Sequence, residues 1–587
     1  MKRPAFDAML RPRSSDDVPI DGVEEGKRLV RAAGGGTPSL AERVAERLRS
    51  FTWAAPLHGL RLNGRQPVRL VAVPIDPIPG DVARGKAMLA GQINYLGEAR
   101  DLARLDLAKP DWTPGFDQYL HGFDWLRDLA MAGSLSQGVP VAEALMSRWL
   151  ARHADKPADP AWSPALWGRR ILFWTAHAPL ILSSTDVVYR AQLLNTLARG
   201  ARHLDRWADK AVAGTGRIAA WSGIIAAGLL IPGGEQRRAF GERGLARALA
   251  SGTFGDGGVV SRGPADLLEA VMLLGMVRAC YEARGLEPPE LMRAALSRMV
   301  PALLGVMHGD RTLSCWQGGG PSTEAHVAAV IEASCIRTRP LRQSRDWGYQ
   351  RLAAAGAVLI VDAAPPPIAR LAAGGCASTL AFEFSDGPDR LVVNCGGARD
   401  HVVQLPGGLA EGLRTTAAHS TLTLADSNST AILSDGTLGR GVTEVELSRQ
   451  ESEGASRIEA SHDGYAARWG FLHRRQLLLT GDGRELRGED ALLPAGKRRP
   501  GADTAFTLRF HLGPGVEATP AAEGPAVMLR TANGAIWQFR CKGGTLSIDD
   551  SLWIDGQGRP VGIRQLVIVG QATGGGAHVS WVMKRAA

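Results

Sequence analysis

The spacing of apolar residues changes along this chain of 587 residues, and this change is the strongest constraint on its fold. From about residue 39 to about residue 335, apolar residues recur at helical spacing in segments separated by short breaks, as in 265–284. From Tyr349 onward every second residue is apolar, as in Leu508-Arg509-Phe510-His511-Leu512. Helices first and antiparallel strands second narrow the architecture to a helical domain followed by a β domain.

The lengths and connections of these segments refine the fold class. Successive helices joined by short loops pack antiparallel and give either a solenoid or an α/α toroid, and the sequence shows no repeat period, which favours an incomplete toroid. At least ten strands follow, separated by turns such as Ser385-Asp386-Gly387, and that number requires a two-sheet sandwich. We expect a flexible arm at 1–38, a helical toroid domain at 39–336 and an antiparallel β-sandwich domain at 347–587.

Composition excludes several classes of function. The 68 basic and 59 acidic residues give a net charge of +9, which favours an anionic partner, but no dense Lys/Arg run or zinc-finger spacing points to nucleic acid. The six cysteines contain no Cys-x-x-Cys pair, which argues against a disulfide framework. Because the sequence has no apolar leader and no apolar stretch of about 18 uncharged residues, we expect a cytoplasmic protein with no transmembrane segment.

Several local strings, taken in order, resemble the heparinase II/III-like polysaccharide lyases over most of the chain. That family combines an α/α toroid with a β-sandwich, and its members cleave acidic polysaccharides such as glycosaminoglycans by β-elimination. The resemblance therefore implies an acidic, uronate-containing polysaccharide as substrate and the cell envelope or periplasm as an alternative location. The strings are His121-Gly122-Phe123-Asp124-Trp125-Leu126-Arg127-Asp128, Gly348-Tyr349-Gln350-Arg351-Leu352, Leu391-Val392-Val393-Asn394-Cys395-Gly396, Ala418-His419-Ser420-Thr421-Leu422, Gly464-Tyr465-Ala466-Ala467-Arg468 and Arg509-Phe510-His511-Leu512.

The residues that the family uses for elimination are largely substituted. Elimination needs a group that neutralises the uronate carboxylate, a base for the C5 proton and an acid for the leaving oxygen. The family's Asn-His pair falls on Thr215 and Gly216, its next histidine falls on Val259, and its tyrosine falls on Asp266.

The family's zinc positions are also altered. They fall on Cys376, Asn394 and His419, of which only the histidine is retained. Asparagine is a weak neutral ligand and the four-coordinate shell is incomplete. We therefore expect no zinc or other metal cofactor at this site, and a buried, hydrogen-bonded His419 is the simpler interpretation.

Other residues in the same region supply candidates for a rearranged site. Arg262 and Asp266 stand four apart at a helix start, where Asp266 would act as base and Arg262 would hold a carboxylate; the alternative is a surface ion pair. His308 offers a titratable imidazole and Tyr349 a phenol as further catalytic groups, whereas a helix-ending histidine and a core-edge tyrosine are the alternatives.

Three more residues are candidates for substrate binding. Trp316 and Gln317 lie in a glycine-rich loop, where the indole would stack on a sugar, and Tyr465 stands near a strand start. Two hypotheses therefore stand: a lyase with a reorganised catalytic set, or a non-catalytic carbohydrate-binding or assembly protein on the same scaffold. Convergence of Arg262, Asp266, His308 and Trp316 in one cleft would favour the lyase.

Overall fold

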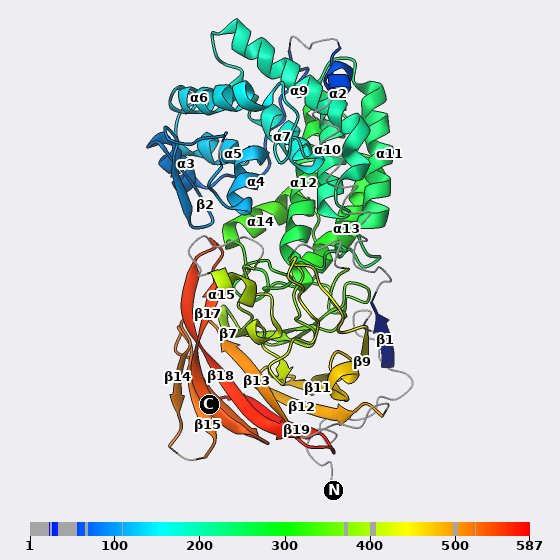
Figure 1. Ribbon diagram of the computed structural model, residues 1–587, viewed down its shortest axis with the longest axis vertical. Helices are drawn as coiled ribbons and strands as arrows, with labels where there is room; N and C mark the ends of the chain where they lie inside the picture. Colours follow the sequence, from blue (N-terminus) through cyan, green and yellow to red (C-terminus); the bar gives the residue numbers. More distant parts are fainter. Residues whose placement is uncertain are drawn as a thin grey trace.

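The computed structural model describes residues 23, 26–32, 56–64, 69–108, 110–368, 374–398, 407–496, 503–522 and 524–586. A helical half and a β half lie end to end along the long axis of the molecule (Figure 1). The predicted order, helices followed by antiparallel sheets, is confirmed. The division at 39–336 and 347–587 stays a prediction.

The helical half is a set of antiparallel helices around one apolar centre. The central helix, α10 (Thr215–Leu230), is buried from Ile218 to its end, because its sequence is apolar on every face. It packs against α7, α9, α11 and α12. The other elements of this half are α2 (Pro56–Arg61), α3 (Val82–Leu89), β2 (Gln92–Tyr95), β3 (Glu98–Asp101), α4 (Pro114–Gly122), α5 (Trp125–Ala132), α6 (Leu135–His153), α7 (Pro164–Ala176), α8 (Ala178–Ile181), α9 (Val187–Trp207), α11 (Glu235–Gly252), α12 (Pro264–Ala283), α13 (Glu290–Gly305) and α14 (Glu324–Ala333).

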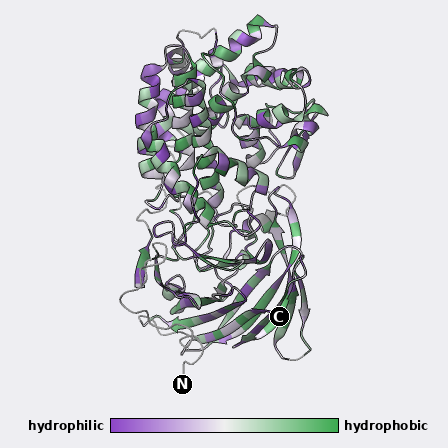
Figure 2. Ribbon diagram, turned by 180° about the vertical axis from the view of Figure 1, so that it is seen from behind, coloured by the Kyte–Doolittle hydropathy of each residue, from purple (hydrophilic) through white to green (hydrophobic). Residues whose placement is uncertain are grey.

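The outer helices are amphipathic. In Figure 2 their outward surfaces are largely hydrophilic, while hydrophobic residues run through the middle of the helical half. None of the helices that the structure describes combines the length and the apolar content needed to cross a membrane.

Two glycines let α7 and α10 cross at backbone contact. A Cβ added at Gly168 would lie 2.0 Å from the Ala219 carbonyl oxygen, and one added at Gly223 would lie 2.5 Å from the Gly168 Cα. Alanine is the better helix former by about 1 kcal/mol, but a clash with backbone cannot be relieved by a rotamer change. Close packing of these helices therefore depends on both glycines.

We expect Gly168→Ala to lower the free energy of unfolding by about 2 kcal/mol, because overpacking a filled core costs about 1–3 kcal/mol. Gly562→Ala is the matched control, since a Cβ there would meet no described atom within 4 Å. Chemical denaturation of both variants measures the difference. Equal stability of the two would contradict the proposed backbone contact.

The β half is a sandwich of two antiparallel sheets with apolar side chains between them. One sheet has the order β1-β9-β10-β11-β12-β19-β16-β15-β14 and the other has the order β17-β18-β13-β7-β6-β5-β4, with β8 beside β13. The strands are β1 (Gly26–Arg31), β4 (Tyr349–Ala354), β5 (Ala357–Asp362), β6 (Phe382–Asp386), β7 (Asp389–Val393), β8 (Leu422–Leu424), β9 (Glu444–Glu451), β10 (Ala455–His462), β11 (Phe471–Thr480), β12 (Glu485–Pro494), β13 (Thr504–Leu512), β14 (Glu517–Pro520), β15 (Ala526–Arg530), β16 (Ile536–Lys542), β17 (Thr545–Ile554), β18 (Pro560–Ala572) and β19 (Ala577–Arg585).

The first strand comes from the segment predicted to be a flexible arm. β1 pairs antiparallel with β9, from Gly26 opposite Arg449 to Arg31 opposite Glu444. An exposed ion pair of 3.1 Å joins Arg31 Nε to Glu444 Oε1. These six residues therefore belong to the sandwich, and most of the remaining arm lies outside the described residues.

Candidate functional site

The predicted site residues lie mainly at the junction between the two halves, and their side chains are buried there. Arg262 is 3% exposed and Asp266 is 8% exposed, while Trp316, Gln317, Tyr349 and His308 are also buried. Arg262, Trp316, Gln317 and Tyr349 form one connected cluster, whereas His308 lies in a second network. Because they are buried, these side chains do not line the single open cleft that would favour the lyase.

Arg262 pairs with the sandwich rather than with Asp266. Its guanidinium donates from Nη2 to Asp362 Oδ1 at 2.5 Å, and from Nε to the Trp347 carbonyl oxygen at 2.9 Å. The guanidinium carbon lies 5.0 Å from the centre of the Tyr349 ring. The surface ion pair considered from the sequence is wrong, because the guanidinium is held in the interior by the first strands of the β half.

Tyr349, Trp316 and Gln317 complete this cluster. The Tyr349 hydroxyl donates to the Arg262 carbonyl oxygen at 2.7 Å, and the Tyr349 and Trp316 rings lie 5.5 Å apart. The Gln317 amide donates to Ser378 Oγ at 3.1 Å and accepts from the Cys376 backbone N–H at 2.9 Å. The Tyr349 hydroxyl and the Gln317 amide have internal partners and the Trp316 ring is fully buried, so these side chains join the halves and present no aromatic plate to a sugar.

Asp266 lies beside Thr215, and the family resemblance places both residues at catalytic positions. The Ser261 hydroxyl donates to its carboxylate, and the Thr215 hydroxyl donates to its backbone carbonyl oxygen at 3.0 Å. Val259 is fully buried. The fold thus brings positions 215, 259 and 266 into one region. The side chains there are a hydroxyl, an isopropyl group and a carboxylate that already accepts a hydrogen bond.

His308 belongs to a second buried network across the junction. Its Nε2 lies 3.1 Å from Glu383 Oε2 and its Nδ1 lies 3.0 Å from Ser385 Oγ. Because a carboxylate only accepts, Nε2 carries the proton and Nδ1 accepts from the serine. Burial and the nearby charge of Arg390 lower the pKa of His308, so the ring is a neutral structural group. The fold therefore does not expose this imidazole.

Tyr465 lies in the sandwich, where its buried hydroxyl donates to the Leu422 carbonyl oxygen at 2.8 Å.

The three positions at which the resemblance places the family's zinc ligands are occupied by residues that form internal hydrogen bonds. Asn394 donates to Glu383 Oε1 at 3.0 Å and accepts from the Ser420 N–H at 2.9 Å, and His419 Nδ1 donates to the Thr415 carbonyl oxygen at 2.7 Å. Both ends of the Asn394 amide are hydrogen-bonded and asparagine is a weak neutral ligand, so this set does not fit zinc.

The described ranges contain no group of three or more His, Cys, Asp or Glu side chains placed to hold a metal ion. Burial lowers the pKa of His419, in line with the simpler interpretation of that residue.

The structure reveals a charged cluster in the helical half that the sequence did not single out. Arg127 forms a bidentate pair with Asp76 at 2.8 and 2.9 Å, and His177 Nε2 lies 3.0 Å from the same carboxylate. Although burial opposes it, Arg127 and His177 hold the pKa of Asp76 below its usual value. We call this set the helical charge cluster. It consists of Arg84, Arg127, Arg169, His177, Asp76, Asp124, Asp128 and Glu269.

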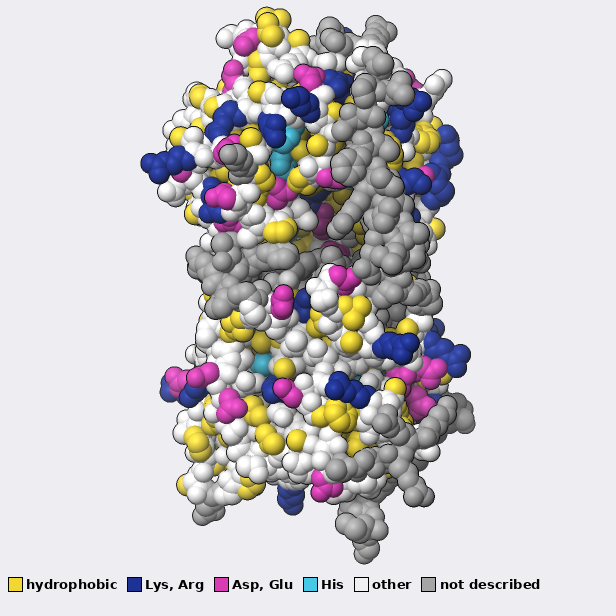
Figure 3. All heavy atoms as spheres, in the orientation of Figure 1, with side chains coloured by type: hydrophobic (Ala, Val, Ile, Leu, Met, Phe, Trp, Pro, Cys, Tyr) yellow, Lys and Arg dark blue, Asp and Glu magenta, His cyan; other side chains and the backbone are white. Residues whose placement is uncertain are grey.

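The half-buried His326 of α14 lies close to this cluster. Burial, followed by the charges of Arg127, Arg84 and Arg169, lowers its pKa to about 4. In Figure 3, basic, acidic and histidine side chains are seen together on this face of the helical half. Three guanidinium groups face four carboxylates in the cluster, so it offers little positive charge to neutralise a uronate.

One signal in the sequence pointed to this cluster. The string from His121 to Asp128, which carries the family resemblance, supplies Asp124, Arg127 and Asp128. Their partners Asp76, Arg84 and Arg169 stand 51, 44 and 45 residues away, so spacing alone could not pair them.

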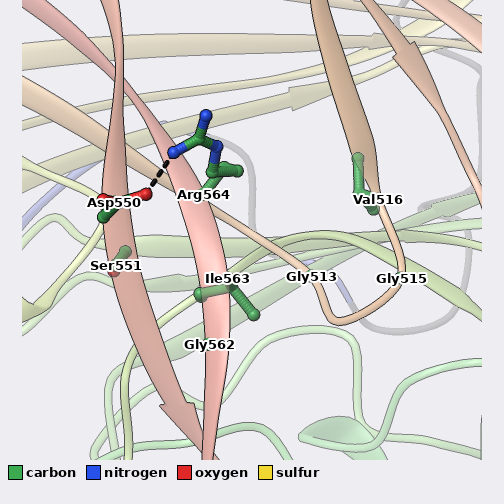
Figure 4. A pocket seen from close by; sticks show the side chains of 8 residues that line it. All are labelled: Gly513, Gly515, Val516, Asp550, Ser551, Gly562, Ile563 and Arg564. Atoms are coloured by element: carbon green, nitrogen blue, oxygen red, sulfur yellow. Dashed lines mark hydrogen bonds and ion pairs between the residues drawn. The ribbon is translucent and has the colours of Figure 1, made fainter.

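A separate hollow of about 430 Å³ lies in the β half, between β18 and the turn after β13 (Figure 4). Ser551 lines it and donates to His511 Nδ1 at 2.7 Å, while His511 Nε2 donates to the Ala417 carbonyl oxygen at 3.0 Å. This arrangement has the form of a serine nucleophile with a base. However, burial lowers the pKa of His511 to about 3, which leaves a weak base, so we interpret the pair as structural.

Comparisons with known proteins agree with the fold. The family model described as Heparinase II/III-like, C-terminal matches residues 336–582. A structure of heparinase III covers 93% of this chain and 91% of its own at 13% identity and a TM-score of 0.67. A mutant of the heparan sulfate lyase HepC from Pedobacter heparinus covers 86% and 82% at 13% identity and a TM-score of 0.55. Identities this low show the fold alone, namely the predicted toroid and sandwich.

One curated protein is similar over nearly its whole length. FtsZ-localized protein C from Caulobacter vibrioides (strain NA1000 / CB15N) is 29% identical over 563 residues, which are 90% of this chain and 92% of that protein.

Proposed function

We propose that this chain, whose residues 336–582 match the family model Heparinase II/III-like, C-terminal, uses its toroid and sandwich as a non-catalytic protein at the site of FtsZ assembly. The observation that carries this proposal is the burial of Arg262, Asp266 and His308 at the junction of the halves. Groups that react with a polysaccharide must reach it, and these are committed to internal hydrogen bonds.

The substitutions at the family's catalytic positions support the same conclusion. Thr215 and Val259 have no ionisable side chain, and the helical charge cluster has more carboxylates than guanidinium groups. A lyase needs a cation or a strong hydrogen-bond donor at the uronate carboxylate and a base at C5. Neither requirement is met by the predicted residues.

The proposed place of action comes from the similarity to FtsZ-localized protein C, which extends over both halves of the chain. An assembly role requires no catalytic group, only a stable surface to which other proteins bind. Two halves joined by the ion pairs Arg262–Asp362 and Asp310–Arg390 supply such a surface, because these pairs help to fix their relative position.

Lyase activity on an acidic polysaccharide is the competing function, and it predicts an unsaturated uronate product. We expect purified protein to produce no rise in ultraviolet absorbance with heparan sulfate, alginate or bacterial exopolysaccharides, while an active lyase serves as positive control. A rise that is lost in Asp266→Ala protein would contradict the proposal.

A fluorescent fusion of the full chain, expressed in its native host, tests the location. We expect it to overlap with labelled FtsZ and to disperse when FtsZ is depleted. A distribution of the fusion that does not overlap with FtsZ, or does not change when FtsZ is depleted, would count against the assembly role, whatever the outcome of the lyase assay.

A further inference from the structure

Arg170, on α7, is a buried arginine whose charge no carboxylate offsets in the described part of the chain. Arg170 is 0% exposed, and burial alone lowers its pKa. Each of the other buried arginines forms an ion pair with a carboxylate; they are Arg127, Arg199, Arg262, Arg390, Arg449 and Arg475. The core of the helical half therefore holds a guanidinium charge for which the described side chains supply no counter-charge.

The contacts of Arg170 fix its guanidinium group but leave one nitrogen without an acceptor. Its Nε and Nη2 donate to the His121 carbonyl oxygen at 3.1 and 2.8 Å, and Nη2 also donates to the Ala161 carbonyl oxygen at 2.8 Å. The guanidinium carbon lies 4.2 Å from the ring centre of Trp149 and 4.3 Å from that of Trp167. Nη1 is buried and has no hydrogen-bond partner among the described residues.

Two further donors without acceptors lie on the same side of α7. The indole N–H groups of Trp167 and Trp174 are buried and have no partner in the described ranges. Positions 167, 170 and 174 are three and four residues apart, so they share one side of the helix. The two indole rings lie 5.8 Å apart, and α7 packs against α4, α9 and α10 inside the helical half (Figure 1).

The charge of Arg170 also acts on three nearby histidines. After burial, it is the next cause that lowers the pKa of His121, to about 2, and that of His153, to about 4. It also contributes, after burial and His58, to the lowered pKa of His203. These imidazoles are therefore neutral near pH 7, and the region around Arg170 has a positive potential that favours a negative group.

We propose that the core of the helical half binds a small monovalent anion of the size of chloride, held by Arg170 Nη1 and the indole N–H groups of Trp167 and Trp174. A halide ion only accepts hydrogen bonds, which matches a set of groups that only donate. A water molecule would leave the charge of Arg170 uncompensated, and its own hydrogens would need acceptors. The nearest carbonyl oxygens, those of His121 and Ala161, already accept from Arg170. A buried charge is stable when a charge of opposite sign pairs with it.

The first test is urea unfolding of the full chain at pH 7, followed by tryptophan fluorescence, while sodium chloride replaces sodium gluconate at constant ionic strength. Gluconate has the same charge as chloride but is too large to enter a closed protein core. We expect the equilibrium constant of unfolding to fall about tenfold as chloride rises to about 100 mM, the effect of a ligand that binds only the folded state with a Kd of about 10 mM. Equal stability in the two salts would overturn the inference.

Substitutions in the site identify where chloride acts. Arg170→Met should abolish the chloride effect, and Trp174→Phe, which keeps an aromatic ring, should reduce it to about twofold, since losing a hydrogen bond to a charged group weakens binding about tenfold. Trp162→Phe is the matched control, because the Trp162 indole already donates to the His153 carbonyl oxygen at 2.7 Å, so the chloride effect should stay near tenfold. Equal chloride effects in Trp174→Phe and Trp162→Phe would overturn the inference, even where Arg170→Met does not fold.

Crystals of the full chain grown in sodium bromide test the position of the ion directly, because bromine has an anomalous diffraction signal. We expect a bromine peak within hydrogen-bonding distance of Arg170 Nη1. A water molecule at this place, with no bromine signal, would overturn the inference. The outcome does not depend on the proposed function, because an anion in the core stabilises the helical half whether or not the protein overlaps with FtsZ.

Discussion

Acidification from pH 7 to pH 4.5 is expected to remove about 5 kcal/mol or more of the free energy of unfolding, at 1.36 kcal/mol per pKa unit per group. Ten of the 12 histidines that the structure describes have a lowered pKa, and burial is the largest cause for each. The values are about 2 for His121 and about 3 for His203 and His511, all of them buried. The others are His58, His153, His308, His326, His419, His462 and His473.

The sign of this effect follows from proton binding. Between a folded pKa of about 3 and an unfolded pKa of about 6.5, the unfolded state binds more protons than the folded state, so stability falls as the pH falls. The carboxylates of Asp76 and Asp490, whose pKa is lowered by paired arginine and histidine side chains despite burial, act in the same direction at still lower pH. The loss should therefore begin near pH 6.5.

Denaturant unfolding followed by circular dichroism at several pH values measures this profile. His326→Gln serves as a comparison, because it removes one group with a pKa of about 4 from a half-buried position and should reduce the loss on acidification. A stability that stays flat between pH 7 and pH 5 would contradict the account.

Asp362→Asn is expected to lower the free energy of unfolding by about 3–5 kcal/mol, the usual cost of leaving one partner of a buried ion pair uncompensated. The substitution keeps the shape of the side chain but leaves Arg262 charged. The side chain of Asp362 has 0% exposure and that of Arg262 has 4%. Neither group can move to water without separating β5 from the start of α12.

Asp550→Asn provides the matched control, because it breaks an ion pair with Arg564 in which the two side chains are 90% and 52% exposed. An exposed pair contributes about 0–1 kcal/mol, so the control should be nearly as stable as the native protein. If both variants lost the same stability under denaturant, the pair between the halves would have no special role in holding them together.

The architecture could be predicted from the sequence because it depends on local spacing. A helix such as α12 has clear start and stop residues, and long alternating segments such as β13 and β11 need only the period of two to be recognised. β1 escaped prediction, since its six residues include three basic ones and gain their structure from pairing with β9, more than 400 residues away.

The environment of the candidate residues could not be predicted in the same way. Nothing near Arg262 in the sequence indicates that its guanidinium group would be buried in an ion pair with Asp362, 100 residues later. The same is true of His308 and Glu383, which are 75 residues apart. Spacing in the sequence identifies side chains that are chemically able to react. Whether they can react depends on their burial, and burial depends on which distant segments meet in the fold.

The position of β1 has a further consequence for the behaviour of the chain outside its native state. An unpaired strand edge offers a row of N–H and C=O groups to any extended segment, and it is a common starting point for aggregation. With β1 in place, the edge of β9 is covered by a strand of the same molecule. Proteolytic loss of the first 31 residues would therefore expose the edge of the long sheet at β9. Only the charges of the exposed Glu444 and Glu446 on that strand would then oppose pairing with another chain.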